Sequence, residues 1–398
     1  MPELFQLNRI VCHRALWLAL GVWGCLPTGA AVAQSNRQLD VPIEAGQFEA
    51  TRSTGGMQCA IRIASQAPAT NAASATNAAS AANAASAANE VTAANEVTAA
   101  NKATVERALD EMERVLRDLA FLSRTNQIHS INANADRDEV VVDGETAALL
   151  QRAVDVCRRT GGAYDPTVAT FDYLWNFSHQ PFVVPLPAEL QSRKAIAGCK
   201  HLVVKQNNII RLLQRGMRVS LRSIARGYAL DRAAQILRAG NLLDFRVIAD
   251  RQVYVQGRTG TRHWYAVAPN ARINDQALGQ LYLSSHAAIT RTDSDSFAIK
   301  LGQRYHDVID PRSAQPAQGV IQATVISADP AVAAMLAEAL FVLGPRAGMA
   351  MLAKERAVEG FVVDAKGKVF ATKGIGDFAR LPTKMDLLSN AAEPVLKR

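Results

Sequence analysis

The sequence predicts an α+β fold in which helices pack against an antiparallel sheet. Short runs rich in β-branched and aromatic residues crowd residues 245–283, and similar runs lie at 322–328 and 360–372. Helical patterns lie before and after these runs rather than alternating with each strand. Strands joined by short turns, with helices segregated from them, indicate α+β with antiparallel pairing.

Residues 1–33 have the layout of a secretory signal peptide. Arg9 and Arg14 supply positive charge, residues 15–22 form a short apolar run, and residues 31–33 form the small-residue cleavage signal Ala-Val-Ala. No later run of about 18 apolar residues follows, so we expect the mature chain to be soluble.

Cys25 raises the alternative of a lipoprotein. Trp23 is bulky at a place where a lipid-attachment site takes a small residue, so lipidation is the less favoured alternative. We therefore expect a cleaved signal peptide, a mature chain from near Gln34 and a periplasmic or exported protein. Membrane contact would come only through a possible lipid anchor or through a partner.

The composition limits the classes of ligand. The net charge is +8 and the pI is about 9.4, but the basic residues are scattered and no aromatic-basic repeat occurs. We therefore expect no nucleic-acid partner and a local bias toward a phosphate-bearing ligand. Outside the leader, the cysteines are Cys59, Cys157 and Cys199. An odd number without short spacing argues against a disulfide framework or zinc site, and at most one pair can form.

One domain is expected over residues 34–380, followed by a C-terminal tail at 381–398. Residues 64–101 interrupt the domain with repeats rich in Ala and Asn and without a large apolar face. We interpret this segment as a low-complexity insertion, either mobile or loosely helical, because Asn and Ser compete for backbone hydrogen bonds.

Helices are expected after the insertion and near the C-terminus. Apolar residues at three-and-four spacing mark a first helix and then a second that ends at Gly161: Val105, Leu109, Met112, Leu116 and Leu119, then Leu150, Val154 and Cys157. Three more helices are predicted over 225–239, 331–343 and 348–354. Strands are predicted at 51–63, 245–250, 252–257, 264–269, 280–285 and 322–328, and hairpins at 200–213 and 360–372.

Residues 159–177, "RTGGAYDPTVATFDYLWNF", contain the first candidate site. Gly161 and Gly162 allow a sharp turn that leaves amide donors uncovered. Asp165 precedes Pro166 and is held extended, so its carboxylate can reach a ribose or ring hydroxyl, or a base amine. The structural alternative is a helix C-cap followed by an Asx-type turn.

Residues 218–237 contain the second candidate site, where a strand ends at Leu221 and a helix starts near Ala225. Four polar residues surround this junction: Ser220, Arg222, Ser223 and Arg226. A helix N-terminus offers free N–H groups and partial positive charge, and arginines add bidentate donors, which together suit phosphate. The alternative is an ordinary capped helix with solvated arginines.

Two further stretches contain acidic candidates. His306 and Asp307 precede a Val-Ile-Asp-Pro turn, and a His near a carboxylate can act as a general base, although such a His is also commonly structural. In the apolar run at 328–344, Glu338 is the single acid after Asp329 at its start. It is either a surface residue or a cation ligand.

Taken in order, these stretches resemble the FAD:protein FMN transferases, the ApbE family. The four matching segments are "TGGAYDPT" at 160–167, "SIARGYALD" at 223–231, "DVIDPRSAQP" at 307–316 and "ALFVLG" at 339–344. The resemblance implies a T-fold-like α+β domain that binds FAD in a cleft between the helical and sheet layers. It implies transfer of FMN from FAD to a Ser or Thr hydroxyl of a flavin-acceptor protein of a redox complex, with release of AMP and help from Mg²⁺.

The resemblance also assigns residues to roles. The expected catalytic residues are His306, Asp307 and Arg226. The expected cofactor-binding residues are Ala163, Tyr164, Asp165, Ser220, Ser223, Arg226 and Ile309, and the expected metal ligands are Glu338 and Ser223.

Several of these positions depart from the family pattern. Three single residues differ: Ser220 stands where the family has an acid, Asp307 where it has a His, and Ala334 where it has an acidic metal ligand. Three segments also differ. Arg222-Ser223 replaces a Gly-Gly or Ser-Ser pair, "IADRQ" at 248–252 replaces an Asn-x-Gly-Gly-Asp stretch, and "RTDS" at 291–294 replaces a Ser-Gly-Asp-Tyr segment. Glu338 lies one helical turn after Ala334 on the same face. Either Glu338 supplies the carboxylate, or Arg222 and Arg226 replace the charge of the metal.

Three hypotheses follow from these departures. The first is an FMN transferase with an altered metal site. The second is a flavin-binding relative with weak catalysis that serves as a periplasmic flavin carrier. The third is a non-enzymatic periplasmic interaction protein that keeps only the scaffold.

Overall fold

The computed structural model describes residues 47–54, 56–64, 81–119, 125–177, 181–259, 261–273 and 276–384, with side chains from residue 99 onward in the third range. The chain divides into two compact units, Met1–Gln34 and Ser35–Arg398, and all described residues belong to the second. The predicted signal peptide, Cys25 and most of the predicted tail lie outside the described residues.

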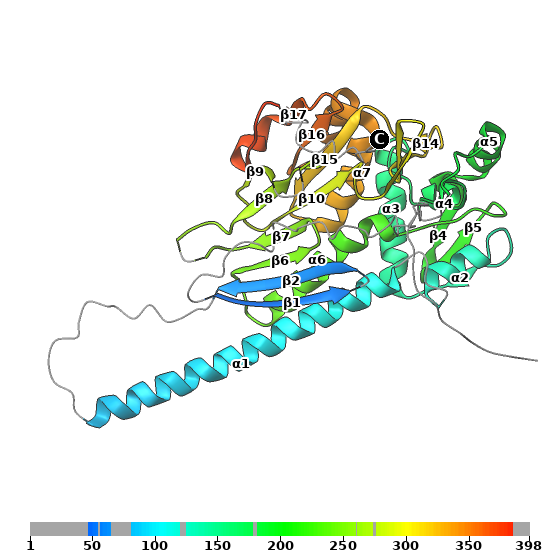
Figure 1. Ribbon diagram of the computed structural model, residues 1–398. Helices are drawn as coiled ribbons and strands as arrows, with labels where there is room; N and C mark the ends of the chain where they lie inside the picture. Colours follow the sequence, from blue (N-terminus) through cyan, green and yellow to red (C-terminus); the bar gives the residue numbers. More distant parts are fainter. Residues whose placement is uncertain are drawn as a thin grey trace, which may run out of the picture. The chain divides into compact units, whose positions relative to one another are not determined.

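An antiparallel sheet of eight strands forms the centre of this unit (Figure 1), which confirms the predicted α+β class. Its order across the sheet is β1 (Gln47–Thr54), β2 (Met57–Ala64), β6 (Phe245–Ala249), β7 (Gln252–Gln256), β10 (His286–Thr292), β15 (Val320–Ser327), β16 (Val358–Asp364) and β17 (Val369–Ala371). Residues in β2, β6, β10 and β15 are almost all buried because both faces of the sheet are covered.

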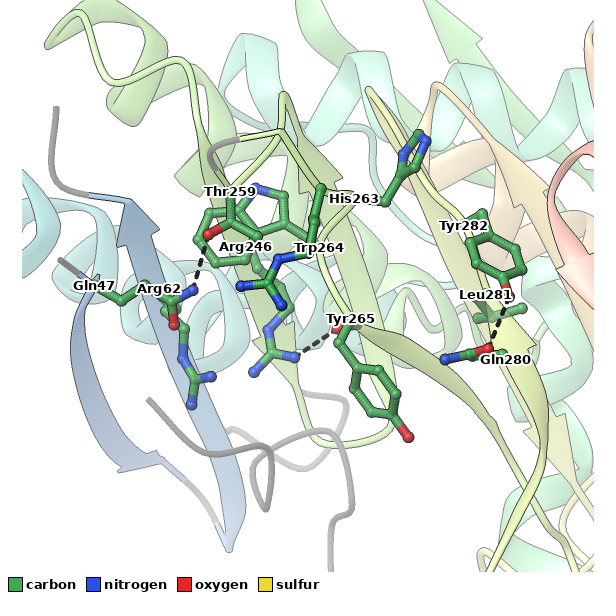
Figure 2. Close-up of a pocket in the computed structure, with 11 residues that line it drawn as sticks. Gln47, Arg62, Arg246, Thr259, His263, Trp264, Tyr265, Gln280, Leu281 and Tyr282 are labelled. Carbon is green, nitrogen blue, oxygen red and sulfur yellow. Dashed lines mark hydrogen bonds between the residues drawn. The ribbon is translucent and has the colours of Figure 1, made fainter. Parts of the chain in front are cut away.

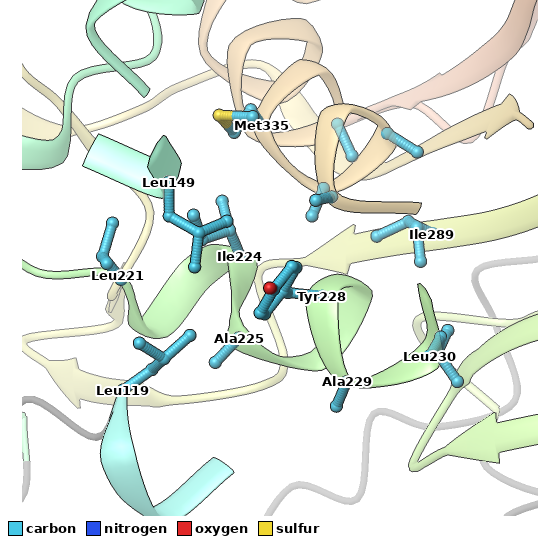
Figure 3. Packing of buried hydrophobic residues seen from close by; sticks show 14 of the residues in the cluster. Leu119, Leu149, Leu221, Ile224, Ala225, Tyr228, Ala229, Leu230, Ile289 and Met335 are labelled. Atoms are coloured by element: carbon cyan, nitrogen blue, oxygen red, sulfur yellow. The ribbon is translucent and has the colours of Figure 1, made fainter. Parts of the chain in front are cut away.

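A layer of helices covers one face of the sheet. It consists of α1 (Ala81–Asp118), α6 (Arg222–Ala239) and α7 (Pro330–Leu352), and α6 packs against both α1 and α7. The predicted apolar stripe from Val105 to Leu119 is buried here. Figure 3 shows Leu119, Ile224, Tyr228 and Met335 meeting in this core. Helix α1 begins within the predicted insertion, at Ala81, and continues without a break into the apolar stripe.

A close approach explains Gly227 in the segment "SIARGYALD". A Cβ atom at this position would lie 2.3 Å from the carbonyl oxygen of Pro330 and 3.1 Å from the Cβ of Ala334. Real atoms do not approach so closely, so α6 and α7 can pack at this distance only with a glycine. Ala334 is 2% exposed and takes part in this contact.

The two helices predicted at 331–343 and 348–354 are joined in the structure as the single kinked helix α7. Gly344 has φ of 71° and Pro345 follows it, so the helix has a kink between the two predicted halves. By length and composition alone α7 also passes the test for a membrane-spanning helix, but 67% of its most apolar window is buried. Its contacts with β10, β15 and β16 are those of a core helix.

A smaller layer covers the opposite face of the sheet. It is a three-stranded antiparallel sheet in the order β18 (Ala379–Arg380), β9 (Ala277–Leu281) and β8 (Ala266–Pro269). A second apolar core between the two sheets includes Ala60, Ile248, Val255, Trp264 and Leu281. Because side chains alternate along a strand, residues on β2 and β6 contribute to both cores.

The remaining elements surround the ends of these layers. The helical ones are α2 (Gln127–Ala133), α3 (Gly144–Arg159), η1 (Pro166–Val168), α4 (Ala169–Trp175), α5 (Pro187–Ile196), η2 (Cys199–His201), η3 (Gln206–Asn208) and η4 (Lys373–Asp377). The strands are β3 (Val140–Val141), β4 (Leu202–Lys205), β5 (Ile209–Leu212), β11 (Phe297–Lys300), β12 (Gln303–His306), β13 (Ile309–Asp310) and β14 (Gln315–Pro316).

The structure corrects some sequence predictions and confirms others. The single strand predicted at 51–63 is wrong: it is the hairpin β1–β2, because Gly56 adopts φ of 80° and allows a tight turn. The strand predicted at 280–285 lies earlier, at Ala277–Leu281. Strand β10 was not predicted. The hairpins at 200–213 and 360–372 are confirmed as β4–β5 and β16–β17.

Candidate functional site

A cavity of about 670 Å³ lies beside the N-terminus of α6. Its wall combines the turn of the β1–β2 hairpin, α1, α4, the first turn of α6, β10 and one buried acid of α7. The described lining residues are Thr54, Met57, Glu113, Leu116, Arg117, Val168, Asp172, Ser220, Arg222, Ser223, Ala225, Arg226, Arg291, Asp295, Ser296, Asp307 and Glu338.

The N-terminus of α6 provides hydrogen-bond donors and positive charge to this cavity. The N-cap residue Leu221 makes no side-chain capping bond, while the hydroxyl of Ser220 accepts a hydrogen bond of 3.1 Å from the backbone N–H of Arg222. Arg222 and Arg226 project from the same turn, and Arg226 Nε lies 3.0 Å from the sulfur of Met57. Amides, helix dipole and guanidinium groups together form a site for a phosphate or diphosphate.

Arginines and carboxylates form an alternating chain along the wall. Asp307 lies between Arg222, whose Nη2 is 3.3 Å from Oδ2, and Arg291, whose Nη2 is 3.5 Å from Oδ1. Arg291 Nη1 also lies 3.7 Å from Oδ2 of Asp295, which is ion-paired with Arg251. Because Arg291 is only 13% exposed, its charge acts on these carboxylates with little screening by water.

Two acids of the wall are shifted toward their neutral form. Burial raises the pKa of Asp172 to about 6, against the opposing effect of Arg222. Burial also raises the pKa of Glu338, which is 6% exposed, against the opposing effect of Arg291. Within the described residues, Glu338 Oε2 has no hydrogen-bond partner. The described lining holds four arginines and five acids, and these raised pKa values lessen the negative charge that the acids set against the arginines.

The segment "TGGAYDPT" supports the wall from behind. Gly161 and Gly162 have φ of 62° and 77°, and Gly162 N–H donates to the carbonyl of Cys157 in a helix C-cap. Asp165 Oδ1 accepts from Thr167 N–H at 2.8 Å, and Oδ2 accepts from Cys199 N–H at 2.9 Å. Both carboxylate oxygens therefore accept hydrogen bonds from backbone N–H groups, as expected for the Asx-turn alternative.

Not all predicted residues reach the cavity. Asp307, Arg226, Ser220, Ser223 and Glu338 line it. Ala163, Tyr164 and Asp165 are buried outside the lining, so their predicted contact with the cofactor has no support in this geometry. Burial, and then the nearby charge of Glu338, raises the pKa of Tyr164.

His306 and Ile309 also lie outside the lining. The ring of His306 is 4% exposed, Nε2 lies 2.9 Å from the carbonyl oxygen of Ala317, and the ring packs edge-on against Phe341. Burial lowers the pKa of His306. Ile309 belongs to a separate apolar cluster with Phe171 and Trp175. In this structure both residues are packed outside the cavity lining, so the expectation that they act in the cavity has no support in this geometry.

Asp172, Arg291 and Asp295 line the cavity but were missed as candidates. Asp172 lies within the segment 159–177, and Arg291 opens the departing segment "RTDS". In the sequence each is an unremarkable charged residue near a strand or helix. Only the tertiary structure brings Arg291 of β10 next to Asp307, which directly follows β12.

A disulfide joins Cys157 of α3 to Cys199 of η2, and Cys59 is free and buried. This confirms the expectation of at most one pair. Among the described residues, the one cluster of three ligand atoms within 4.8 Å is Cys157, Asp165 and Cys199, and its two sulfurs are bonded to each other. No such three-ligand cluster therefore forms in the described part of the cavity.

Fold and cavity together define an α+β protein with a cavity, lined by arginines and acids, at the N-terminus of a helix that packs on the sheet. The sequence profile of the ApbE family matches residues 63–362, and the chain belongs to this family. The chain is 29% identical over 300 residues to an FAD:protein FMN transferase of Treponema pallidum, covering 70% of this chain and 82% of that protein. It is 26% identical over 255 residues to the FAD:protein FMN transferase of Vibrio cholerae, covering 62% and 76%.

Solved structures of the family share the fold. The ApbE protein from Thermotoga maritima superposes with a TM-score of 0.69 at 24% identity, covering 84% of this chain and 99% of that chain. The flavin transferase ApbE from Vibrio cholerae gives a TM-score of 0.65 at 22% identity, with 83% and 99% covered.

Proposed function

We propose that this protein is an FAD:protein FMN transferase that acts in the cavity at the N-terminus of α6. The observation that carries the proposal is that Arg222, Arg226 and Arg291 line one cavity at the N-terminus of α6, where the N-cap residue Leu221 makes no side-chain capping bond. The cavity volume of about 670 Å³ lies in the range of cofactor sites. A diphosphate is the part of FAD that this arrangement fits best.

The reaction joins the hydroxyl oxygen of the acceptor to the phosphorus of FMN and breaks the bond from that phosphorus to the AMP oxygen. The hydroxyl proton must be removed, and the departing AMP phosphate gains negative charge. Arg222 and Arg226 on α6 would hold the diphosphate, and Arg291 on β10 would stabilise the charge that develops on the leaving group.

We assign the general base to Asp172. Both carboxylate oxygens of Asp307 face guanidinium groups of Arg222 or Arg291, so its negative charge is already neutralised. Asp172 lines the same cavity, and its raised pKa of about 6 gives it a higher proton affinity than an ordinary carboxylate while leaving it ionised at neutral pH. Asp307 would then position the two arginines rather than accept the proton.

Magnesium, expected from the resemblance with Glu338 and Ser223 as ligands, does not fit the described residues well. The unpartnered Oε2 of Glu338 is one suitable oxygen. However, Arg291 acts on both Glu338 and Asp307, so a dication there would face a buried guanidinium. We therefore infer that arginines rather than a metal supply the positive charge.

We further propose that the protein is exported and modifies a flavin-acceptor protein of a redox complex. The leader pattern supports export, and the Cys157–Cys199 disulfide is typical of an oxidising compartment. Mass spectrometry of the N-terminus of the mature protein from the periplasm tests this location. A start near Gln34 supports cleavage, and a lipid on Cys25 would support the anchor instead.

The decisive experiment mixes the protein, FAD and a flavin-acceptor domain, and measures the acceptor by mass spectrometry. We expect a covalent gain of one FMN less one water, with release of AMP. The Arg222→Met variant is expected to lose this gain, while Arg158→Met, on the exposed face of α3, retains it. FAD binding without any transfer would contradict the proposal and favour the flavin-carrier alternative.

A further inference from the structure

A second cavity, of about 450 Å³, lies between the large sheet and the β8–β9 sheet. Arg62 on β2 and Arg246 on β6 face it from the large sheet, at positions alternating with the residues of the helix-side core (Figure 2). The cavity around Arg222 lies on the helix side. The two cavities are therefore separated by the sheet, and the second is not part of the site described above.

Among the described residues, the floor of the second cavity contains two arginines and one carboxylate. Glu49, Arg62 and Arg246 lie opposite one another on β1, β2 and β6 and are 9%, 3% and 1% exposed. Arg62 Nε donates a hydrogen bond of 2.7 Å to Oε2 of Glu49, and Arg246 Nη2 lies 3.9 Å from the same oxygen. One carboxylate thus faces two guanidinium groups.

Arg246 retains unused donors. Its Nη1 donates to the backbone carbonyl of Tyr265 at 2.7 Å, as Figure 2 shows, but Nε and Nη2 have no hydrogen-bond partner among the described residues. Burial and the neighbouring Arg62 lower the pKa of Arg246 to about 10, so it stays charged at neutral pH. Its ionic partner Glu49 lies 3.9 Å away and is shared with Arg62, so an anion at this place would bind donors of a buried charge that is only partly compensated.

The other walls are suited to an organic molecule. Trp264, Tyr265 and Tyr282 contribute aromatic surface, and Gln280 contributes an amide that accepts from the Tyr282 hydroxyl at 2.8 Å. Figure 2 shows Tyr282 and Gln280 across the cavity from the paired arginines. Small-ligand sites commonly combine such apolar walls with a few convergent polar groups.

We propose that this second cavity binds a small organic oxyanion, a carboxylate or phosphate ester, with its charged end on Arg246 and its ring against Trp264. The inference does not depend on the proposed transferase activity, because its residues lie on the other face of the sheet. Such a site would let an aromatic acid or phosphate bind the protein without competing for the flavin cavity.

Tryptophan fluorescence tests this proposal on the mature full chain. Trp175 and Trp264 are the two tryptophans after the leader, so Trp264→Phe assigns the signal. Titration with phenyl phosphate and with benzoate should change the fluorescence saturably and distinguish a preference for phosphate from one for carboxylate. Phenol, which has the ring without the anion, should change it at least about tenfold more weakly, as expected for loss of a charge-assisted hydrogen bond.

Three variants separate the site from general charge effects. Arg246→Met should weaken binding about tenfold or more, whereas Arg158→Met removes the same charge from an exposed helix and should leave it unchanged. Glu49→Gln removes the competing carboxylate and should tighten binding, which gives a test that does not depend on the Arg246 variant folding well. Equal affinity in all three variants, or a full signal in Trp264→Phe, would overturn the proposal.

Discussion

Arg291 Nη2 lies 3.5 Å from Asp307 Oδ1, and both side chains are nearly buried in the wall of the flavin-site cavity. Strand β10 carries the arginine, and Asp307 directly follows β12, so residues distant in sequence form one charge pair. The pair lies beside Glu338, whose Oε2 has no hydrogen-bond partner among the described residues. A fixed guanidinium thus occupies the acidic region where a metal ion was expected.

Arg291→Met is expected to reduce FMN transfer by about 10²–10³-fold, the usual effect of removing one preorganised charge stabiliser. Arg251→Met is the matched control, because Arg251 pairs with the same Asp295 but does not line the cavity. Single-turnover transfer and circular dichroism separate loss of chemistry from loss of fold. An Arg291→Met enzyme that is folded and as fast as the control would rule out the role assigned to this arginine.

The rate of FMN transfer should rise with pH through about 6, because Asp172 must lose its proton to act as a base. Asp172→Asn should lower the rate and remove this part of the pH profile. Measurement of transfer rates between about pH 5 and 8 checks the prediction. A histidine with its ordinary pKa near 6.5 would titrate in the same range. His306, however, is buried outside the cavity lining. An unchanged profile in Asp172→Asn would contradict it.

Asp172 should also affect stability with a defined sign. Its pKa is raised from 3.8 to about 6 on folding, so the folded protein binds more protons than the unfolded chain between these values. The contribution of Asp172 to the free energy of unfolding therefore falls as the pH rises from about 4 to 6. Asp172→Asn is expected to have a higher Tm than the wild type at pH 7 and a smaller difference at pH 4. Thermal unfolding at both values tests this.

FAD binding is expected to persist in EDTA, because arginines rather than a metal provide the positive charge. Equilibrium dialysis with and without magnesium should give affinities within about twofold of each other, a difference worth less than RT. Glu338→Gln should likewise leave any magnesium effect unchanged. Loss of binding in EDTA, restored by magnesium only when Glu338 is present, would instead establish the metal site.

The disulfide should stabilise the domain. Cys157 and Cys199 are 42 residues apart in sequence, and a loop of this size predicts a loss of roughly 2–4 kcal/mol in the Cys157→Ala/Cys199→Ala variant. Urea unfolding measures this loss.

Cys59 is buried and its pKa is raised to about 11 by burial, so the native mature protein should show no reactive thiol and the unfolded, unreduced protein one. Three reactive thiols after unfolding would show that the disulfide does not form.

The sequence by itself determined the class of fold and the family. Apolar spacing located the stripe from Val105 to Leu119, turn residues located the hairpins, and the four motifs located Arg226, Asp307 and Glu338 in the wall of the cavity. These features are local in sequence, and local patterns record which face of a helix or strand is buried.

Only the tertiary structure decided which side chains share the cavity. It removed His306 and Asp165 from the lining, because packing on Phe341 and bonds to Thr167 and Cys199 direct them elsewhere. It added Arg291 of β10 to the lining, and the pairing of β2 with β6 placed Arg62 beside Arg246. Strand order brings together residues up to hundreds of positions apart, and one chain contains no periodicity that encodes such neighbours.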